Sequence, residues 1–172
     1  GGGIPVLARK MDEINEMVEA AKVYIAQSEL AGIFDKGDPE MTMIWQEGPA
    51  WCRARPDWLT ADRAIMLDYK STATNADPNA FIRQIINMGY DYSVGHYLRG
   101  SNALGMRPGW VFLVQENEPP YACSLVGIAP PMLELAERKA EYALMLWKHA
   151  MSTGRWSGYP SRICYAEPPE YA

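Results

Sequence analysis

The segment that decides the fold is residues 63–70, Arg-Ala-Ile-Met-Leu-Asp-Tyr-Lys. Its central Ile-Met-Leu run predicts a β-strand that carries polar residues toward its carboxyl end. Side chains alternate between the two faces of a strand, so Asp68 and Lys70 share one face while Leu67 and Tyr69 share the other. A carboxylate and an ammonium are therefore presented side by side at the end of this strand.

Two further β-like runs precede this segment. They are residues 41–46 and 50–55, and the Glu-Gly-Pro sequence between them suits a hairpin turn. Residues 59–62 form a second connection, so the three runs together predict a three-stranded antiparallel meander. Asp57 follows the second run, and pairing through this connection brings its carboxylate next to Asp68.

Three helices and two more strands are expected in the remaining chain. Apolar residues recur at helical spacing from about residue 11 to residue 30, across residues 79–98 after Pro78, and along residues 131–152. The two strands, residues 109–115 and 121–128, lie between the second and third helices. This order predicts an α/β sandwich around a mixed sheet, with a right-handed crossover if the strands before and after the second helix are parallel neighbours.

We expect one domain spanning residues 1–172. The 172 residues are 48% hydrophobic, about the size of one globular unit, and no repeat or linker divides them. Residues 1–10 are expected to be a flexible start or a cloning remnant, and residues 154–172 an irregular tail. The apolar runs are far shorter than the ~20 residues that cross a bilayer, and no signal-peptide pattern is present. We therefore expect a soluble, cytoplasmic protein without membrane contact.

Composition limits the metals and partners that the chain can bind. The three cysteines are odd in number and widely separated, which indicates reduced thiols and no thiolate metal site. With only two histidines, a metal would be held by carboxylates, which favours Mg²⁺ or Mn²⁺. The net charge of −5 argues against a general polyanion binder. It still leaves room for a local basic groove.

Two carboxylates and a lysine at one sheet edge suit phosphodiester hydrolysis. Carboxylates can hold one or two divalent ions that generate hydroxide and neutralise charge on the phosphate. The lysine can then orient the attacking water, and the backbone carbonyl of Tyr69 is available as a further ligand. The alternative is an ordinary ion pair, because Asp-x-Lys in a strand is usually a cross-strand or surface salt bridge.

The residues around this cluster resemble a known nuclease family. Residues 51–59, Trp-Cys-Arg-Ala-Arg-Pro-Asp-Trp-Leu, and residues 66–72, Met-Leu-Asp-Tyr-Lys-Ser-Thr, are similar to the catalytic hairpin of the RecE-like (exodeoxyribonuclease VIII-like) branch of the PD-(D/E)XK nucleases. Relatives of this branch include lambda exonuclease and the RecB nuclease domain. The resemblance extends to residues 81–84, 89–92 and 156–160.

The resemblance implies a restriction-endonuclease-like three-layer core, with a mixed sheet of about five strands flanked by helices. It implies a Mg²⁺-dependent deoxyribonuclease, an exonuclease of recombination or phage replication, with Asp57 and Asp68 as metal ligands and Lys70 as the catalytic lysine. The family also places an acid or histidine on the helix before the hairpin. Glu29 is the first candidate for this metal ligand and Glu40 the second, although either is equally readily a solvated glutamate.

DNA contacts are expected on the hairpin and on the helix after the lysine strand. Relatives carry Gln-x-x-x-Tyr on that helix, whereas this chain has Ser93 and Tyr97, which share a helix face. Gln84 is a candidate to replace the missing glutamine. Arg53 and Arg55 alternate onto one strand face and can meet phosphate, with solvated surface residues as the alternative for both.

DNA is the partner that the resemblance implies. It also admits a homo-oligomer, since processive relatives form rings around DNA, and a recombination partner protein. A second hypothesis is a catalytically inactive nuclease-fold module for DNA binding or assembly, which Ser93 and the net charge of −5 favour. A third is a restriction or repair endonuclease, which shares the same site.

Overall fold

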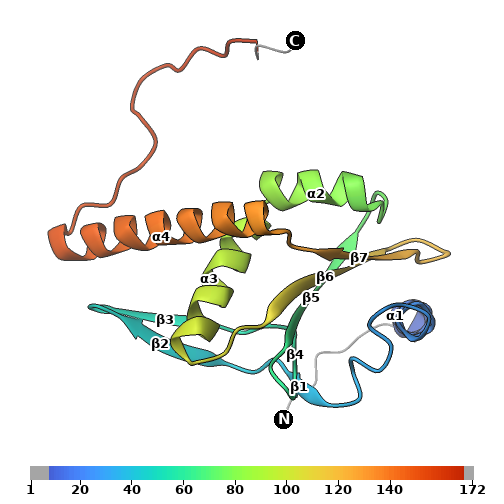
Figure 1. The fold of residues 1–172 in the computed structure, drawn as a ribbon. Helices are drawn as coiled ribbons and strands as arrows, with labels where there is room; N and C mark the ends of the chain where they lie inside the picture. Colours follow the sequence, from blue (N-terminus) through green and yellow to red (C-terminus); the bar gives the residue numbers. More distant parts are fainter. Residues whose placement is uncertain (1–7, 169–172) are drawn as a thin grey trace.

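The structure, a computed structural model, describes residues 8–168 of the chain and is drawn in Figure 1. In chain order its elements are α1 (Ala8–Ala26), β1 (Gly37–Pro39), β2 (Met43–Glu47), β3 (Ala50–Ala54), β4 (Trp58–Thr60), β5 (Ile65–Thr72), α2 (Pro78–Asn87), α3 (Tyr90–Ala103), β6 (Gly109–Glu116), β7 (Cys123–Gly127) and α4 (Pro130–Thr153). Residues 1–7 and 169–172, parts of the expected flexible start and irregular tail, lie outside the described residues. Residues 8–10, also part of the expected flexible start, are the first residues of α1.

The main sheet has five strands in the order β1-β4-β5-β6-β7. β5 and β6 are parallel neighbours over residues 65–72 and 109–116, and the other pairs in this sheet are antiparallel. The chain passes from β5 to β6 through α2 and α3, as predicted from the helical pattern between these strands. The expected mixed sheet of about five strands flanked by helices is confirmed, and it is compatible with a restriction-endonuclease-like core.

The expected three-stranded meander is wrong. β2 and β3 pair with each other in a separate two-stranded sheet, with Trp45 opposite Cys52. β5 pairs instead with β4, a strand of three residues that is too short to show a periodic pattern. Pro56 lies between β3 and β4, and proline has no backbone N–H to continue a strand ladder. The chain therefore leaves the hairpin before it joins the main sheet.

The expected single helix at residues 79–98 is two helices, α2 and α3. Asp77 caps the first, because its side chain accepts a hydrogen bond from the backbone N–H of Ala80. Gly89 separates the two helices with a φ of 70°, a left-handed conformation that glycine adopts without the steric cost that a Cβ imposes. α3 therefore begins afresh at Tyr90, close to the end of β5.

The two faces of the main sheet carry separate apolar cores, because side chains alternate along β5. Met66 faces a core shared with α2, α3 and α4, and its buried members include Phe81, Val94, Phe112 and Ala136. Leu67 faces the opposite core, which contains Ile25 of α1, Ile33 and Leu113. Figure 1 shows α1 on one side of the sheet and the other three helices on the other, so the expected three layers are present.

The β2–β3 hairpin is held against α3. The Trp45 ring packs over Gly100, where an added Cβ would lie 2.5 Å from a ring carbon. Glu47 accepts hydrogen bonds from Nε of Arg99 with both carboxylate oxygens, each at 2.7 Å, and from the indole N–H of Trp45 at 2.9 Å. Packing and charge pairing together fix the hairpin beside the helix.

α4 ends at Thr153, with Gly154 as its C-cap, and residues 154–168 contain no helix or strand. Figure 1 shows this tail leaving the layered body.

Among residues 8–168, none of the helices is both long enough and apolar enough to cross a bilayer.

Candidate metal centre

Asp57 lies immediately before β4 and next to Asp68 of β5. The antiparallel register pairs Trp58 with Leu67, which places the residues before and after them side by side at the carboxyl end of β5. The Asp57 carboxylate accepts a hydrogen bond from the backbone N–H of Tyr69 at 2.8 Å. The predicted proximity of the two aspartates is therefore present, although β4 rather than the expected second strand brings Asp57 there.

Lys70 forms an ion pair with the Asp68 carboxylate, so the two residues share a strand face as predicted. The Asp68 side chain is 13% exposed and the Lys70 side chain is 26% exposed. The ammonium also lies 3.5 Å from the backbone carbonyl oxygen of Tyr69. One ammonium, two carboxylates and one carbonyl thus converge at a single point on the sheet.

The Asp68 carboxylate has a pKa above its ordinary range. Burial is the largest cause, because removal from water disfavours the charged form, and the negative charge of Asp57 adds to the effect. Lys70 opposes both, but does not reverse the direction of the pKa shift. The cluster therefore lacks positive charge for its two acids, and a bound cation would supply it.

The donor set of this centre fits a hard divalent cation. Asp57 and Asp68 offer carboxylate oxygens and Tyr69 offers its carbonyl oxygen, which are the ligand types that Mg²⁺ and Mn²⁺ prefer. Among residues 8–168, no group of three or more acid, histidine or cysteine side chains is close enough to form a metal site. The protein side chains would thus contribute two ligands and leave positions for water or phosphate oxygens.

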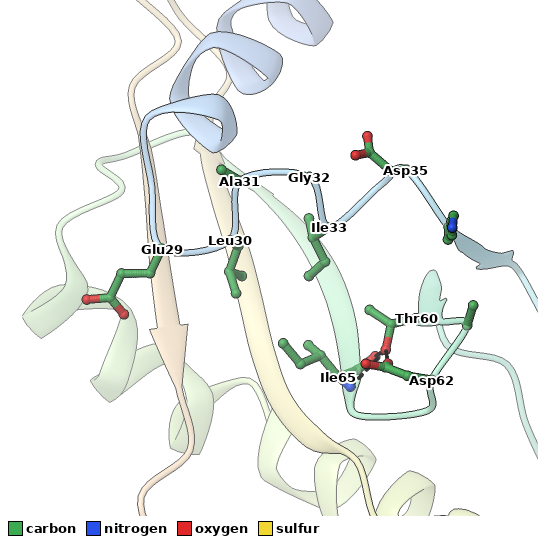
Figure 2. Close-up of a pocket in the computed structure, with 11 residues that line it drawn as sticks. Glu29, Leu30, Ala31, Gly32, Ile33, Asp35, Thr60, Asp62 and Ile65 are labelled. Carbon is green, nitrogen blue, oxygen red and sulfur yellow. Dashed lines mark hydrogen bonds between the residues drawn. The ribbon is translucent and has the colours of Figure 1, made fainter.

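The structure does not bring Glu29 to this centre. α1 ends at Ala26, so Glu29 lies in the following turns rather than on the helix where we placed it. Its side chain is exposed, and Figure 2 shows it directed away from Ile33 and Ile65. Ser28 helps to end the helix, because its hydroxyl donates to the Ile25 carbonyl. The assignment of Glu29 as a helical residue that faces the metal is therefore wrong.

Glu40, the second candidate, lies nearer to the centre. Its backbone N–H donates to the carbonyl of Asp57 at 3.1 Å. Its carboxylate forms an ion pair with Arg55 at 2.7 Å, and both side chains are about half exposed, at 50% and 55%. Glu40 is thus close in backbone terms, while its carboxylate is engaged by an arginine.

The expected DNA-contact residues divide into two groups. Arg53, Ser93 and Tyr97 line one pocket between β3, α3 and α4, together with several aromatic side chains. Gln84 lies on α2 and is not among the residues that line this pocket, and Arg55 is paired with Glu40.

Tyr90 is a residue near the centre that the sequence did not reveal. Its ring lies 5.2 Å from the Lys70 ammonium, a cation–π arrangement that restrains the lysine. The neighbouring Asp91 is fully buried and forms an ion pair with Lys139 of α4, which anchors the start of α3. Gly89 was the available signal, because a glycine inside a helical pattern can mark a break.

Gln115 is the second such residue, on the far face of the sheet. It is 1% exposed, and its carbonyl oxygen accepts a hydrogen bond from the Tyr69 hydroxyl at 2.9 Å. Its amide donates to the Met17 carbonyl of α1 at 2.8 Å. Tyr69 is therefore held from behind, and the signal in the sequence was a glutamine at the end of the apolar run of β6.

Comparison with known proteins gives a structural match and no sequence match. No protein-family model and no curated protein sequence matches the chain. The structure is similar to a crystal structure from Eubacterium rectale named "Putative exonuclease", with a TM-score of 0.66 and 13% identity over 96% of this chain. The likeness shows that this chain shares the fold of that protein.

This likeness covers only part of the other protein. The chain spans 65% of the length of the Eubacterium rectale protein. At 13% identity the likeness concerns the fold and not the activity. The crystal structure of SSO0001 is a weaker match, with a TM-score of 0.39 and 15% identity over 80% of this chain and 69% of that one.

Proposed function

We propose that this protein is a Mg²⁺-dependent deoxyribonuclease of the RecE-like type that hydrolyses DNA phosphodiester bonds as an exonuclease. The observation that carries the proposal is the convergence of Asp57, Asp68 and Lys70 along the second half of the central strand β5, with a buried carboxylate whose pKa is raised. The resemblance of residues 51–59 and 66–72 to the family's catalytic hairpin supports it. The structural likeness to the Eubacterium rectale protein supports the fold that this proposal needs.

The residues of the centre divide the work of hydrolysis. Asp57, Asp68 and the Tyr69 carbonyl would hold Mg²⁺ or Mn²⁺, which activates water and neutralises charge on the phosphate when bound. Lys70, held by Asp68 and by the Tyr90 ring, can donate a hydrogen bond to the attacking water or to a phosphate oxygen. Because the ammonium is restrained from two sides, little ordering of its side chain remains for the reaction.

The proposal extends to biological setting and partners. DNA is the substrate and partner, and recombination or phage replication in the cytoplasm is the setting that the RecE-like resemblance implies. A homo-oligomer and a recombination partner protein belong to the same proposal, and gel filtration with and without linear DNA examines the oligomer.

The test is cleavage of linear duplex DNA in the presence of Mg²⁺ by the wild-type protein and two variants. Asp68→Ala and Lys70→Ala should each abolish release of nucleotides, while circular dichroism shows an unchanged fold. Glu19→Ala is a control that should retain cleavage, since it removes an exposed acid on α1, on the opposite side of the sheet. Retained cleavage in both Asp68→Ala and Lys70→Ala would refute the proposal.

A second candidate function is a catalytically inactive nuclease-fold module that binds DNA. Two observations favour it: no third acid side chain joins Asp57 and Asp68 within the described chain, and serine stands at position 93. Such a module would bind DNA without consuming it. Binding of linear DNA at a protein concentration that gives no cleavage with either Mg²⁺ or Mn²⁺ would favour this candidate over the enzyme.

A further inference from the structure

A pocket of about 460 Å³ lies between the hairpin, α3 and α4. Its walls include Trp51 and Arg53 of β3, Tyr92 and Tyr97 of α3, and Trp147 of α4, and we call it the aromatic pocket. Three of these rings are unusually exposed for their size: Trp51 is 71% exposed, Trp147 is 50% and Tyr92 is 45%. Trp147 lies edge to face with Trp156, with 5.1 Å between ring centroids, and the Lys139 ammonium lies 5.0 Å from the Tyr92 ring centroid. All three rings still keep exposed surface that a ligand can contact.

The charge around the aromatic pocket differs from that of the whole chain. The chain contains 21 acidic residues and has a net charge of −5. None of the described residues that line the pocket is an aspartate or glutamate, and Arg53 is a basic residue among them. A second cavity shares Trp51 and Trp147 with it, has no acid in its described lining, and adds Lys148. The pocket is thus complementary to an anion.

Exposed rings with cations and no acids match the chemistry of unpaired nucleotides. A base can stack on an aromatic ring while its phosphate meets a lysine or arginine. Base pairing and stacking in a duplex hide these faces, so the rings favour a single strand. An apolar protein partner could pack against the rings, but it would gain nothing from the absence of acidic residues in the described lining.

The aromatic pocket adjoins the candidate metal centre along two elements. Tyr92 and Ser93 lie within one helical turn of Tyr90, whose ring contacts the Lys70 ammonium. β3 carries Trp51 and Arg53 and ends at Ala54, three residues before Asp57. A strand that occupied the pocket would therefore lead toward the carboxylates.

We propose that the aromatic pocket binds the unpaired bases of single-stranded DNA, with Trp51, Tyr92 and Trp147 as stacking surfaces and Arg53 as a phosphate contact. This inference rests on the proposed function, because it supplies the single-stranded segment of the DNA that the metal centre would cleave. It adds that a strand end must be unpaired next to the centre.

The test is binding of a fluorescein-labelled 20-nucleotide oligothymidine and of a 20-base-pair duplex to the Asp68→Asn protein in EDTA, followed by anisotropy. The single strand should bind more tightly than the duplex. Trp51→Ala and Trp147→Ala should each weaken its binding about tenfold, the effect of one lost stacking contact. Tyr142→Ala is the control: it removes a ring that is 59% exposed on α4 but does not line the pocket. The affinity of this variant for the single strand should equal that of the Asp68→Asn protein.

An oligonucleotide with abasic sites in place of its bases separates stacking from charge. It should bind the parent protein more weakly than oligothymidine, and Trp51→Ala should weaken it no further. Trp51→Phe should restore affinity for oligothymidine, because a ring is retained. Equal affinity of all variants for oligothymidine would overturn the proposal. A loss of affinity in Trp51→Ala that is as large for the abasic strand as for oligothymidine would also overturn the proposal.

Sedimentation of the same variants excludes another occupant. If Trp51→Ala and Trp147→Ala lower the mass of the protein in solution instead of its DNA affinity, a second copy covers the pocket and the proposal is wrong. All these binding measurements are made without Mg²⁺, so they do not depend on catalysis. A protein that binds single strands through the pocket but never cleaves DNA would refute the proposed function and leave this inference standing.

Discussion

Two ion-paired carboxylates in this protein have similar side-chain exposure, yet their pKa values move in opposite directions. The Asp68 side chain is 13% exposed and is paired with Lys70, while the Glu47 side chain is 14% exposed and is paired with Arg99. The pKa of Asp68 is raised, with burial as the largest cause. The pKa of Glu47 is lowered, with the hydrogen bond from Arg99 as the largest cause.

The difference comes from how deeply each carboxylate lies among protein atoms, which is greater for Asp68, and from the groups that surround it. Glu47 has the guanidinium of Arg99 and the indole N–H of Trp45 as donors. Asp68 has one ammonium, and it faces a second carboxylate, that of Asp57. The charge of Glu47 is therefore balanced within the folded chain and serves to dock the hairpin. The single ammonium of Lys70 does not offset burial and the charge of Asp57 at Asp68, which is consistent with the metal-ligand role that we propose for it.

The largest expected difference between the two sites is in catalysis. Asp68→Asn should lower DNA cleavage by at least about 100-fold, a typical loss when a group that stabilises the transition state is removed. Glu47→Gln should leave cleavage within a few-fold of wild type at a temperature where both proteins are folded. Initial rates of nucleotide release from linear DNA measure both. A comparable loss in Glu47→Gln would remove the functional distinction between the sites.

The next effect is on stability at neutral pH without metal. Glu47→Gln should lower the free energy of unfolding by about 1–3 kcal/mol, the range for a hydrogen bond to a charged group. Asp68→Asn should be neutral or stabilising, because it removes a charge that burial and Asp57 both disfavour. Urea unfolding provides the comparison. The idea of an unbalanced charge fails if Asp68→Asn is the more destabilised variant.

A smaller effect is the pH dependence of these stabilities. The stabilising effect of Glu47 is present above the pKa of an unfolded glutamate and is lost as the pH falls through the lowered folded pKa. The deficit of Glu47→Gln should therefore narrow below about pH 4. The effect of Asp68 on stability changes with pH in the opposite direction. The Asp68 carboxylate takes up a proton more readily in the folded protein than in the unfolded chain, so wild type gains stability relative to Asp68→Asn as the pH falls.

Unfolding curves of the three proteins at several pH values between neutral and about pH 3.5 test these signs, since aspartate and glutamate of the unfolded chain titrate in that range. Parallel pH profiles for the two variants would contradict the opposite pKa directions on which the comparison is built.

The smallest expected effect is at Tyr69, which lies in the sequence between Asp68 and Lys70, the two side chains for which we propose catalytic roles. Tyr69→Phe removes the donor to the buried carbonyl oxygen of Gln115 and should cost about 1 kcal/mol of stability. The backbone N–H of Tyr69 still donates to the Asp57 carboxylate, so cleavage should fall by less than about tenfold. A loss of about 1 kcal/mol of transition-state stabilisation corresponds to less than that factor. Tyr142→Phe is the control, because Tyr142 is exposed on α4. Unchanged stability in Tyr69→Phe would show that Gln115 does not hold this residue.

The parts of the centre that could be predicted from the sequence depend on local regularity. Alternation along one strand placed Asp68 and Lys70 on the same face, and the structure confirms their contact. The position of Asp57 beside Asp68 was also predicted, but through the wrong strand pair. A strand as short as β4 has no pattern of its own, and its pairing is decided by tertiary packing.

The parts that could not be predicted depend on where elements end. The break at Gly89 is a single residue inside a helical pattern, and helices also tolerate glycine without breaking. Glu29 was assigned by extending α1 by one turn beyond Ala26, and that turn decides which way the side chain points. Helix ends depend on local capping and packing, which periodicity does not report.

Calorimetric titration of Mn²⁺ into the wild-type protein, Asp68→Asn and Glu47→Gln tests the central claim most directly. Wild type and Glu47→Gln should bind Mn²⁺ with similar affinity, and Asp68→Asn should show no binding heat at the same concentrations. Binding of Mn²⁺ by Asp68→Asn as tight as that by the wild type, or no binding by the wild type, would contradict the assignment of Asp68 as a metal ligand.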